Sequence, residues 1–416
     1  ATSTGLLDLV NRVTALETQG VAGPAGPAGA NGANGANGAN GTNGVTGRNY
    51  GRTITSLTTV DTNIVGYYSS ITIGADGNPI ISYYDVNAGA LKVAACTNTT
   101  CTTALTPTTV DNSASVGKYS SITIGADGNP IISYYDSTDN DLKVAACTNT
   151  TCTTAATITI VDDTGNVGGF SSITIGADGN PIISYYDFTD DALKVAACTN
   201  TTCTTSTLTV VDDTNNVGYY SSITIGADGN PIISYYDSTD DALKVAACTN
   251  PTCTTSTPTV VDNSANDVGA FSSITIGADG NPIISYYDND AGALKVAACT
   301  NTTCTTKTIT AVDTGDGNDV GKHSSITIGA DGNPIISYYD TTATALKVAA
   351  CINATCTTAV TPTTVDAGGA NNVGEYSSIT IGADGNPIIS YLAANAGALK
   401  VAKLTRTSWT PNTWES

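Results

Sequence analysis

Cysteine is the residue type with the most regular chemical spacing in this sequence. All 12 cysteines fall into six C-x4-C pairs: Cys96–Cys101, Cys147–Cys152, Cys198–Cys203, Cys248–Cys253, Cys299–Cys304 and Cys351–Cys356. A zinc site would need a second pair or histidines close by, but the pairs are far apart and the chain has one histidine. We therefore predict six local disulfides and a folded protein in an oxidising environment, extracellular or at a cell surface.

A side chain with an aromatic ring precedes the dipeptide Ser-Ser at seven places: Tyr68, Tyr119, Phe170, Tyr220, Phe271, His323 and Tyr376. The seven rings either wedge neighbouring repeats together or form stacking platforms for a sugar ligand. His323 has no second histidine or catalytic cysteine with which to act as a general base, so we predict a structural role for it. We assign no catalytic residue and predict that the chain is not an enzyme.

Seven aspartates stand in D-G-N triplets, where a carboxylate can bind calcium or shape a turn: Asp76, Asp127, Asp178, Asp228, Asp279, Asp331 and Asp384. Asp-Gly is the dipeptide that a tight hairpin turn favours, so turn formation is the preferred interpretation. Calcium is the weaker alternative. We predict no metal site and no other cofactor.

Five asparagines stand in N-x-T triplets: Asn98, Asn149, Asn200, Asn301 and Asn353. Pro251 blocks a sixth triplet at Asn250. In a eukaryotic secretory pathway these asparagines are candidate glycosylation sites, whereas in a bacterium they are more simply polar turn residues.

These residues are positioned by a repeat of 50 to 53 residues. The segment SSITIGADGNPIISYYD begins at Ser69, Ser120, Ser171, Ser221, Ser272, Ser324 and, with an altered end, Ser377. Each repeat predicts two strands, SSITI and PIISYY, joined by the ADGN turn. A third strand is predicted at LKVAAC, and a fourth at a Thr- and Val-rich segment such as TTALTPTTV. Seven units of four antiparallel strands predict an all-β, seven-bladed β-propeller.

The last repeat differs from the others because it lacks both cysteines. Leu404 and Trp409 stand at the equivalent positions, and residues 410–416 remain as a tail. Residues 52–61, RTITSLTTVD, align with the fourth strand of a blade. We therefore predict that the strand at residues 53–60 closes the ring by pairing antiparallel with residues 399–404. The alternative is that it adds a strand to another molecule and builds a fibre.

The predicted topology sorts the loops onto two faces. The ADGN turns and the disulfide loops share one face, which hardly varies between repeats. The loops between second and third strands share the other face with the interblade loops, and here the repeats differ, as in VNAGA, STDND and FTDDA. This second face, rich in Asp, is either relaxed in its packing or the face that meets a partner.

The first 50 residues have a different pattern. Leu6, Leu9, Val13 and Leu16 form a short heptad seam, and from Gly20 to Gly47 every third residue is Gly. These patterns predict a trimeric coiled coil over residues 1–19, a collagen-like triple helix over 20–49 and the propeller over 50–416. The partner is then the chain itself, as a homotrimer.

The repeats resemble those of secreted bacterial and archaeal propellers through their GNPIISYYD segments, and the stem resembles collagen-like bacterial surface proteins through its G-X-Y run. The resemblance implies an extracellular structural or adhesive protein, on a cell surface or in a filament. A multivalent lectin with a glycan ligand and a phage or viral fibre are the alternatives. The net charge of −21 disfavours nucleic acid and anionic lipid, and no apolar run is long enough to insert into a membrane.

Overall fold

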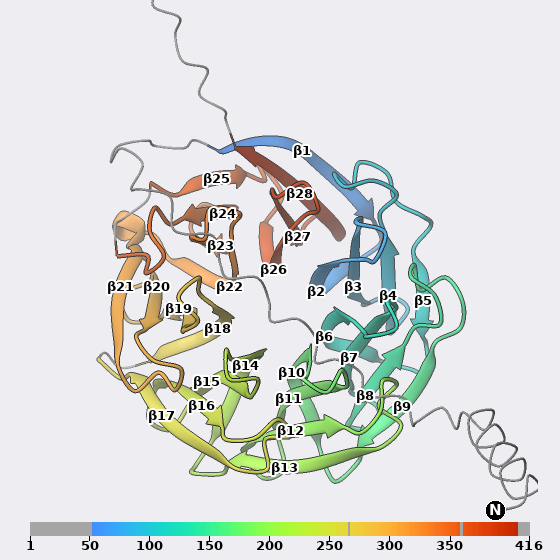
Figure 1. Cartoon of the computed structure of the whole chain (residues 1–416). Helices are drawn as coiled ribbons and strands as arrows, with labels where there is room; N and C mark the ends of the chain where they lie inside the picture. The colour runs from blue at the N-terminus through green and yellow to red at the C-terminus, as the bar shows by residue number, and fades with distance from the viewer. Residues whose placement is uncertain (1–51, 265–266, 358–360, 407–416) are drawn as a thin grey trace, which may run out of the picture. The chain divides into compact units, whose positions relative to one another are not determined.

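The computed structural model of the chain describes residues 52–264, 267–357 and 361–406. These residues form seven four-stranded antiparallel sheets, arranged around a central axis as the blades of a propeller (Figure 1). One 3-10 turn, η1 (Gly315–Gly317), interrupts a loop, and no α-helix occurs among the described residues. The predicted coiled coil (1–19) and collagen-like stalk (20–49) lie outside these residues, as do Trp409 and the tail.

Each blade contains four strands that are neighbours in order from the axis outward. The innermost strands are β2 (Val65–Ile73), β6 (Val116–Ile124), β10 (Val167–Ile175), β14 (Val217–Ile225), β18 (Val268–Ile276), β22 (Val320–Ile328) and β26 (Val373–Ile381). The second strands are β3 (Pro79–Asp85), β7 (Pro130–Asp136), β11 (Pro181–Asp187), β15 (Pro231–Asp237), β19 (Pro282–Asp288), β23 (Pro334–Asp340) and β27 (Pro387–Ala393).

The third strands are β4 (Ala90–Ala95), β8 (Asp141–Ala146), β12 (Ala192–Cys198), β16 (Ala242–Cys248), β20 (Ala293–Cys299), β24 (Ala345–Ala350) and β28 (Ala398–Arg406). The outer strands are β5 (Thr108–Asp111), β9 (Thr157–Asp162), β13 (Ser206–Asp212), β17 (Ser256–Asp262), β21 (Lys307–Asp313), β25 (Thr363–Asp366) and β1 (Arg52–Asp61). We number the blades 1 to 7 in the order of their innermost strands, so β2 belongs to blade 1 and β26 to blade 7.

The outer strands of blades 1 and 6 are shorter than predicted. The fourth strand was expected to cover the whole of TTALTPTTV, but β5 begins only at Thr108 and β25 only at Thr363. In both blades a proline, Pro107 or Pro362, comes directly before the strand. Each of these prolines stands one position further from the second cysteine of its blade than Pro258 stands from the second cysteine of blade 4. A proline donates no hydrogen bond to the neighbouring strand, so pairing starts after it.

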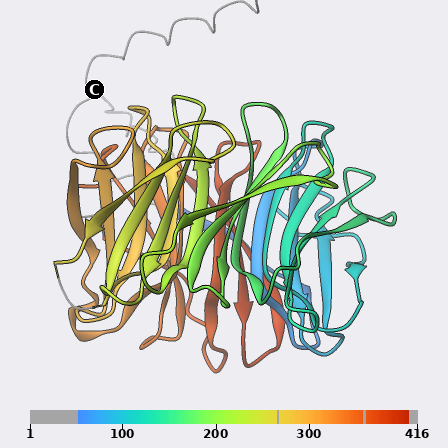
Figure 2. The same ribbon diagram turned by 90° about the horizontal axis from the view of Figure 1, so that it is seen from below.

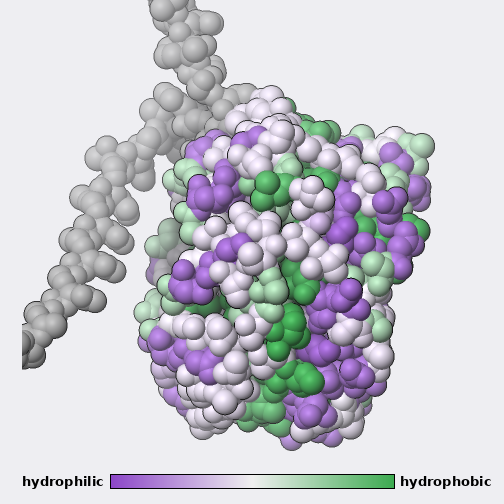
Figure 3. Space-filling model, turned by 90° about the vertical axis from the view of Figure 1, so that its right-hand side faces the viewer, coloured by the Kyte–Doolittle hydropathy of each residue, from purple (hydrophilic) through white to green (hydrophobic). Residues whose placement is uncertain are grey.

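The outer strands form the rim of the ring and carry some exposed apolar side chains. Ile158 and Ile160 on β9 are 39% and 53% exposed. Figure 3 views the rim from the side on which β5 and β9 lie and shows apolar patches between polar residues. Such exposure is ordinary for an edge strand, which has no further strand to cover it.

The hydrophobic core lies between adjacent blades. In one typical cluster Ile182, Leu193 and Val195 of blade 3 pack against Ile223 and Tyr235 of blade 4. The innermost strand comes so close to the preceding blade that a Cβ atom at Gly218, where φ is +112°, would lie 2.9 Å from the Cα atom of Leu193. Glycine is therefore required at this position of the repeat.

An aspartate at the end of each outer strand, buried in six of the seven blades, joins its blade to the next one. In blade 3, Asp212 accepts hydrogen bonds from the Tyr235 hydroxyl at 2.6 Å and the Lys244 ammonium at 2.7 Å, both in blade 4. Burial alone would raise the pKa of Asp212, but the hydrogen bonds from Lys244, Thr214 and Tyr235 outweigh it and hold that pKa below its usual value. We call this arrangement the interblade latch.

The tyrosine–aspartate bond of the latch is present at all seven junctions, with distances of 2.6 to 2.8 Å. The lysine bonds the same aspartate at six of them. At the remaining junction Lys143 instead pairs with Asp136 of its own blade at 2.5 Å. Each latch thus ties the rim of one blade to the interior of the next.

The two ends of the propeller segment close the ring as predicted. Strand β1 pairs antiparallel with β28 of the same chain, with Ile54 opposite Leu404 and Asp61 opposite Leu399. Leu404 is fully buried at the position that a cysteine occupies in the other blades. Lys403, also fully buried, forms an ion pair of 2.7 Å with Asp384 in the β26–β27 turn. Apolar packing and an ion pair thus replace the disulfide in blade 7.

The loops divide between two faces as the topology predicted. The strands run from one face of the ring to the other, with the connecting loops at the two ends (Figure 2). On one face, which we call the variable face, the β3–β4 loop and the neighbouring interblade loops are hydrogen-bonded to each other, as in Val86 N to Ile64 O and Val116 N to Gly89 O. The D-G-N turns and the disulfide loops form the opposite face, which we call the turn face.

Removing the closing strand is expected to open the ring. A variant that lacks residues 1–61 leaves the edge of β28 unpaired, and an unpaired edge is a template for aggregation. A matched variant that lacks only residues 1–49 keeps β1 and should give a soluble monomer with the melting temperature of the intact head. Light scattering and thermal unfolding measure both properties. A soluble, equally stable protein without residues 1–61 would contradict closure by β1.

Candidate functional site

The seven predicted ring-bearing residues line the central channel. Each lies in an innermost strand at a break in the strand register, for example between Tyr219 and Ser222 in β14. All seven have a left-handed backbone with φ between 51° and 55°. Side chains of a regular strand point toward the neighbouring blades, so this bulge is what directs the rings to the axis.

The seven rings form one closed circle. Neighbouring ring centroids are 4.4 to 4.7 Å apart around the whole circle. This distance is at the short end of the range for packed aromatic pairs, so every ring contacts two others. The arrangement suits a plug that wedges the blades together better than seven separate platforms for sugar rings.

Two rings of serines stand beside the aromatic circle. The first serine of each Ser-Ser pair donates to the carbonyl of the preceding blade's aromatic residue, as Ser69 does to Tyr376 at 2.9 Å. The second serine accepts from a backbone N–H of the following blade, as Ser70 does from Ile122 at 3.2 Å. The aromatic residues and the first serines line a cavity of about 180 Å³ on the axis.

His323 is one member of this aromatic circle. Its ring centroid lies 4.5 Å from that of Phe271 and 4.6 Å from that of Tyr376. Burial, together with the positive charge of Lys322, lowers the pKa of His323 to about 3. The side chain is therefore neutral at physiological pH and packs as an aromatic ring.

At the mouth of the channel, on the variable face, lies a group of tyrosines that sequence analysis did not single out. They are the second tyrosines of the YYD triplets: Tyr84, Tyr135, Tyr186, Tyr236, Tyr287 and Tyr339, with Leu392 in blade 7. Their hydroxyls reach Asp, Asn or Ser side chains of the variable loops, as Tyr287 reaches Asp319 and Tyr135 reaches Asn166. The variable loops thus differ in chemistry around six equivalent tyrosine hydroxyl groups.

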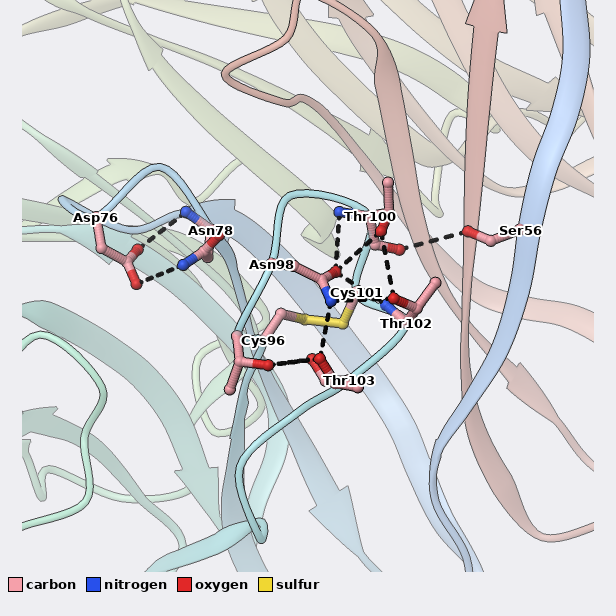
Figure 4. Close-up of a disulfide and its surroundings, with 10 residues drawn as sticks. Ser56, Asp76, Asn78, Cys96, Asn98, Thr100, Cys101, Thr102 and Thr103 are labelled. Atoms are coloured by element: carbon pink, nitrogen blue, oxygen red, sulfur yellow. Dashed lines mark hydrogen bonds between the residues drawn. A yellow bond between two sulfur atoms is a disulfide. The ribbon is translucent and has the colours of Figure 1, made fainter.

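The cysteines pair as predicted, in six disulfides within single hairpins. Figure 4 shows the Cys96–Cys101 loop, in which the Asn98 side chain is held by the loop itself. The Asn98 Nδ2 atom donates to Thr102 and Thr103, and its Oδ1 atom accepts from the Thr100 and Thr102 N–H groups. A glycan on Nδ2 would disturb these bonds.

The same network surrounds Asn250, although Pro251 makes that triplet unsuitable for glycosylation. The asparagine therefore has a role in shaping the loop that does not depend on the N-x-T triplet. Asn149, Asn200, Asn301 and Asn353 make corresponding bonds in their loops.

The D-G-N aspartates lie on the turn face and bond within their own turns. The Oδ1 atom of Asp76 accepts from the Asn78 N–H at 2.9 Å, and its Oδ2 atom accepts from the Asn78 amide at 2.8 Å (Figure 4). Both oxygens are thus used in shaping the turn. Within the described ranges, no three acidic, histidine or cysteine side chains are grouped so as to hold a metal ion.

Comparison with known proteins gives a fold and no family. No family model matches the chain, and no curated protein matches its sequence. A solved structure of an α-L-arabinofuranosidase from Fusarium graminearum is similar with a TM-score of 0.48 and 12% identity, over 69% of this chain and 92% of that one. The NanB sialidase of Streptococcus pneumoniae gives 0.47 and 9%, over 83% and 70%. The S. cerevisiae core factor gives 0.51 and 11%, over 88% and 62%.

These likenesses show the propeller fold alone. They also correct one prediction. We predicted that the chain is not an enzyme, and this prediction is wrong as a conclusion from the architecture, because an arabinofuranosidase and a sialidase are among the similar structures. At 12% and 9% identity the likeness assigns no reaction to this chain. The six disulfides indicate an oxidising, extracellular environment. The described residues contain no helix that is long and apolar enough to span a membrane.

The lowered pKa of His323 predicts a pH dependence of stability. Below pH 6.5 the unfolded chain binds a proton at His323, whereas the folded chain does not bind it until about pH 3. The stability of the folded chain therefore decreases as the pH is lowered through this interval. Between pH 6.5 and 5 the loss should be on the order of 1–2 kcal/mol. Substitution His323→Phe, which copies blades 3 and 5, should remove this loss.

Denaturant unfolding of both proteins at pH 7 and pH 5 measures this difference. An identical pH dependence in the original protein and in His323→Phe would contradict a neutral, packed imidazole.

Proposed function

We propose that this chain is an extracellular adhesive protein in which a trimeric, collagen-like stalk displays three propeller heads. Each head binds its partner through the variable face. The strict G-X-Y register of residues 20–47 supports the trimer, because only glycine fits at the axis of a triple helix. Three heads on one stalk would convert weak single contacts into a firm attachment.

The observation that carries the binding proposal is the contrast between the two faces. On the turn face the D-G-N triplet is the same in all seven repeats, and asparagine, threonine and cysteine hold the same loop positions in six of them. On the variable face six blades present different loop side chains beside a tyrosine hydroxyl, and blade 7 has Leu392 in place of the tyrosine. A frame that repeats closely on one face and varies on the other is the arrangement expected of a scaffold that presents binding loops.

A multivalent lectin remains a second form of the same proposal. In the form of the lectin hypothesis that the sequence suggests, the sugar stacks on the seven channel rings. Those rings pack against each other, so the loops of the variable face are the better location for a sugar contact. For a filament, the pairing of β1 within its own chain favours assembly through the stalk or the rim over exchange of strands.

The trimer is tested on the full chain by light scattering and thermal unfolding. We expect three chains per particle. Gly32→Ala places a methyl group at the crowded axis and should lower the temperature at which the chains separate, whereas the neighbouring change Ala33→Ser should not. A monomer of the full chain would overturn the stalk proposal.

The binding face is tested on an array of extracellular-matrix proteins and glycans. Asp240 is exposed in the β15–β16 loop of the variable face, and Ala227 is exposed in the β14–β15 turn of the opposite face. We expect Asp240→Arg to weaken binding and Ala227→Arg to leave it unchanged. Loss of binding with Ala227→Arg alone, or no binding of the full chain to any component, would contradict the proposal.

A further inference from the structure

The tyrosines at the channel mouth are covered by the following blade. The covering residue directly precedes the channel aromatic. It stands two positions after the valine that begins each innermost strand. Lys118 lies over the ring of Tyr84 at 6.0 Å, and Tyr219 packs on Tyr186 at 4.2 Å. We call this residue the cap of the tyrosine.

In blade 3 another side chain takes the place of a missing cap. Its cap position is Gly169, which has no side chain to cover Tyr135. Phe188, from the β11–β12 loop, fills the space instead: a Cβ atom at Gly169 would meet the Phe188 ring at 2.4 Å, and this ring lies 5.9 Å from that of Tyr135. An absent cap is thus compensated within the chain.

Among the described residues, none caps Tyr236 in blade 4 or substitutes for a cap. The cap position is Ala270, whose methyl group is too short to cover a tyrosine ring. The other five tyrosines of the set are buried, at most 7% exposed, and Tyr236 alone is half-buried. Part of its side chain is therefore open to solvent on the variable face.

The hydroxyl of Tyr236 lies between two carboxylates. It is 2.9 Å from Asp241 Oδ1 and 2.8 Å from Asp267 Oδ1. A tyrosine hydroxyl has one proton, so it can satisfy only one of these two acceptors at a time. Asp267 also accepts from the Asn289 amide through Oδ2 at 2.7 Å.

Neither carboxylate of this pair is balanced by a cation of the described residues. In the part of the chain that the structure describes, neither Asp241 nor Asp267 forms an ion pair. The site therefore combines a partly exposed tyrosine with two carboxylates that form no ion pair among the described residues.

Blade 5 contains a related site, in which Gly292 stands at the position of Asp241 and a cation is in place. There the Tyr287 hydroxyl bonds to Asp319 at 2.5 Å, and the cap is Lys322. The Lys322 ammonium lies 5.1 Å from the centroid of the Tyr287 ring and 2.8 Å from Asp319 Oδ2. An ammonium over a tyrosine ring and against a carboxylate is a favourable cation–π and ionic contact.

From this comparison we propose that Tyr236, Asp241 and Asp267 bind a primary ammonium group of a partner, namely a lysine side chain on a protein surface. The lysine would take the place that Lys322 takes over Tyr287, with its ammonium on the Tyr236 ring and its N–H groups directed to the two carboxylates. The net charge of −21 favours the approach of such a partner. This inference rests on the proposed function and names the chemistry of its partner.

Titration of the full chain with Nα-acetyl-lysine methylamide tests the site. NMR spectra should show one saturable site per chain, and the norleucine analogue, which has no ammonium group, should not bind. Ala270→Lys supplies an internal cap like Lys322 and should weaken binding at least tenfold. The double substitution Asp241→Asn and Asp267→Asn should weaken it at least fivefold.

Lys322→Ala is the matched variant with the opposite effect. It uncovers Tyr287 and its single carboxylate partner Asp319, so a second, weaker binding site should appear in each chain. Unchanged melting temperatures show that each variant is folded. The proposal is overturned if Ala270→Lys binds the lysine probe as well as the original protein does. It is equally overturned if the norleucine analogue binds as tightly, or if a neutral monosaccharide displaces the lysine probe.

The two proposals fail in different ways. If the chain binds array components through the variable face but no lysine probe binds at Tyr236, the ammonium site is wrong and the adhesive function stands. If the probe binds at Tyr236 and the chain binds nothing on the array, the site stands and the adhesive function is wrong.

Discussion

The ring depends on the aspartate at the end of each outer strand, which is buried in six of the seven blades. This side chain belongs to one blade and bonds the tyrosine, and at six of seven junctions the lysine, of the next. A buried carboxylate is costly unless it is paired, so the arrangement is stable only when two blades are correctly aligned. Hydrophobic clusters between blades supply the attraction, and the latch restricts the geometry in which they pack. The seam follows the same rule, because Asp61 of β1 bonds Tyr83 and Lys92 of blade 1.

Much of this architecture follows from the repeat. The copies are long enough for four strands, their turns are of a hairpin type, and the missing cysteines of the last copy mark the seam. The latch was missed, although its Tyr, Lys and Asp recur in every copy within otherwise apolar strands. Its partners lie 22 to 34 residues apart and in different blades, so no single repeat contains the contact. The left-handed bulge that turns Tyr68 and its counterparts to the axis is likewise invisible in sequence, since any aromatic in a regular strand would face a neighbouring blade.

The proposed ammonium site at Tyr236 arises where one blade departs from the sequence of the other repeats. Seven equivalent positions allow each blade to serve as a control for the others, and the differences between them identify what the chain has changed. Gly169 with Phe188 preserves a cap, whereas Ala270 removes one. Because the frame is held by latches, disulfides and the aromatic circle, these changes alter the surface without altering the fold. That separation explains how a close repeat can carry a single, specific site on one face.

Double-mutant cycles on the latch test most directly whether the seam is held in the same way as a junction within the ring. Unfolding free energies of Asp212→Asn, Lys244→Met and the double variant give the coupling within the ring, and the corresponding changes at Asp61 and Lys92 give the coupling at the seam. We predict a coupling of about 1–3 kcal/mol for Asp212 and Lys244. A smaller but measurable coupling is expected for Asp61 and Lys92, whose side chains are each 15% exposed. Coupling within the ring but none at the seam, or none at either place, would contradict a ring closed by seven latches.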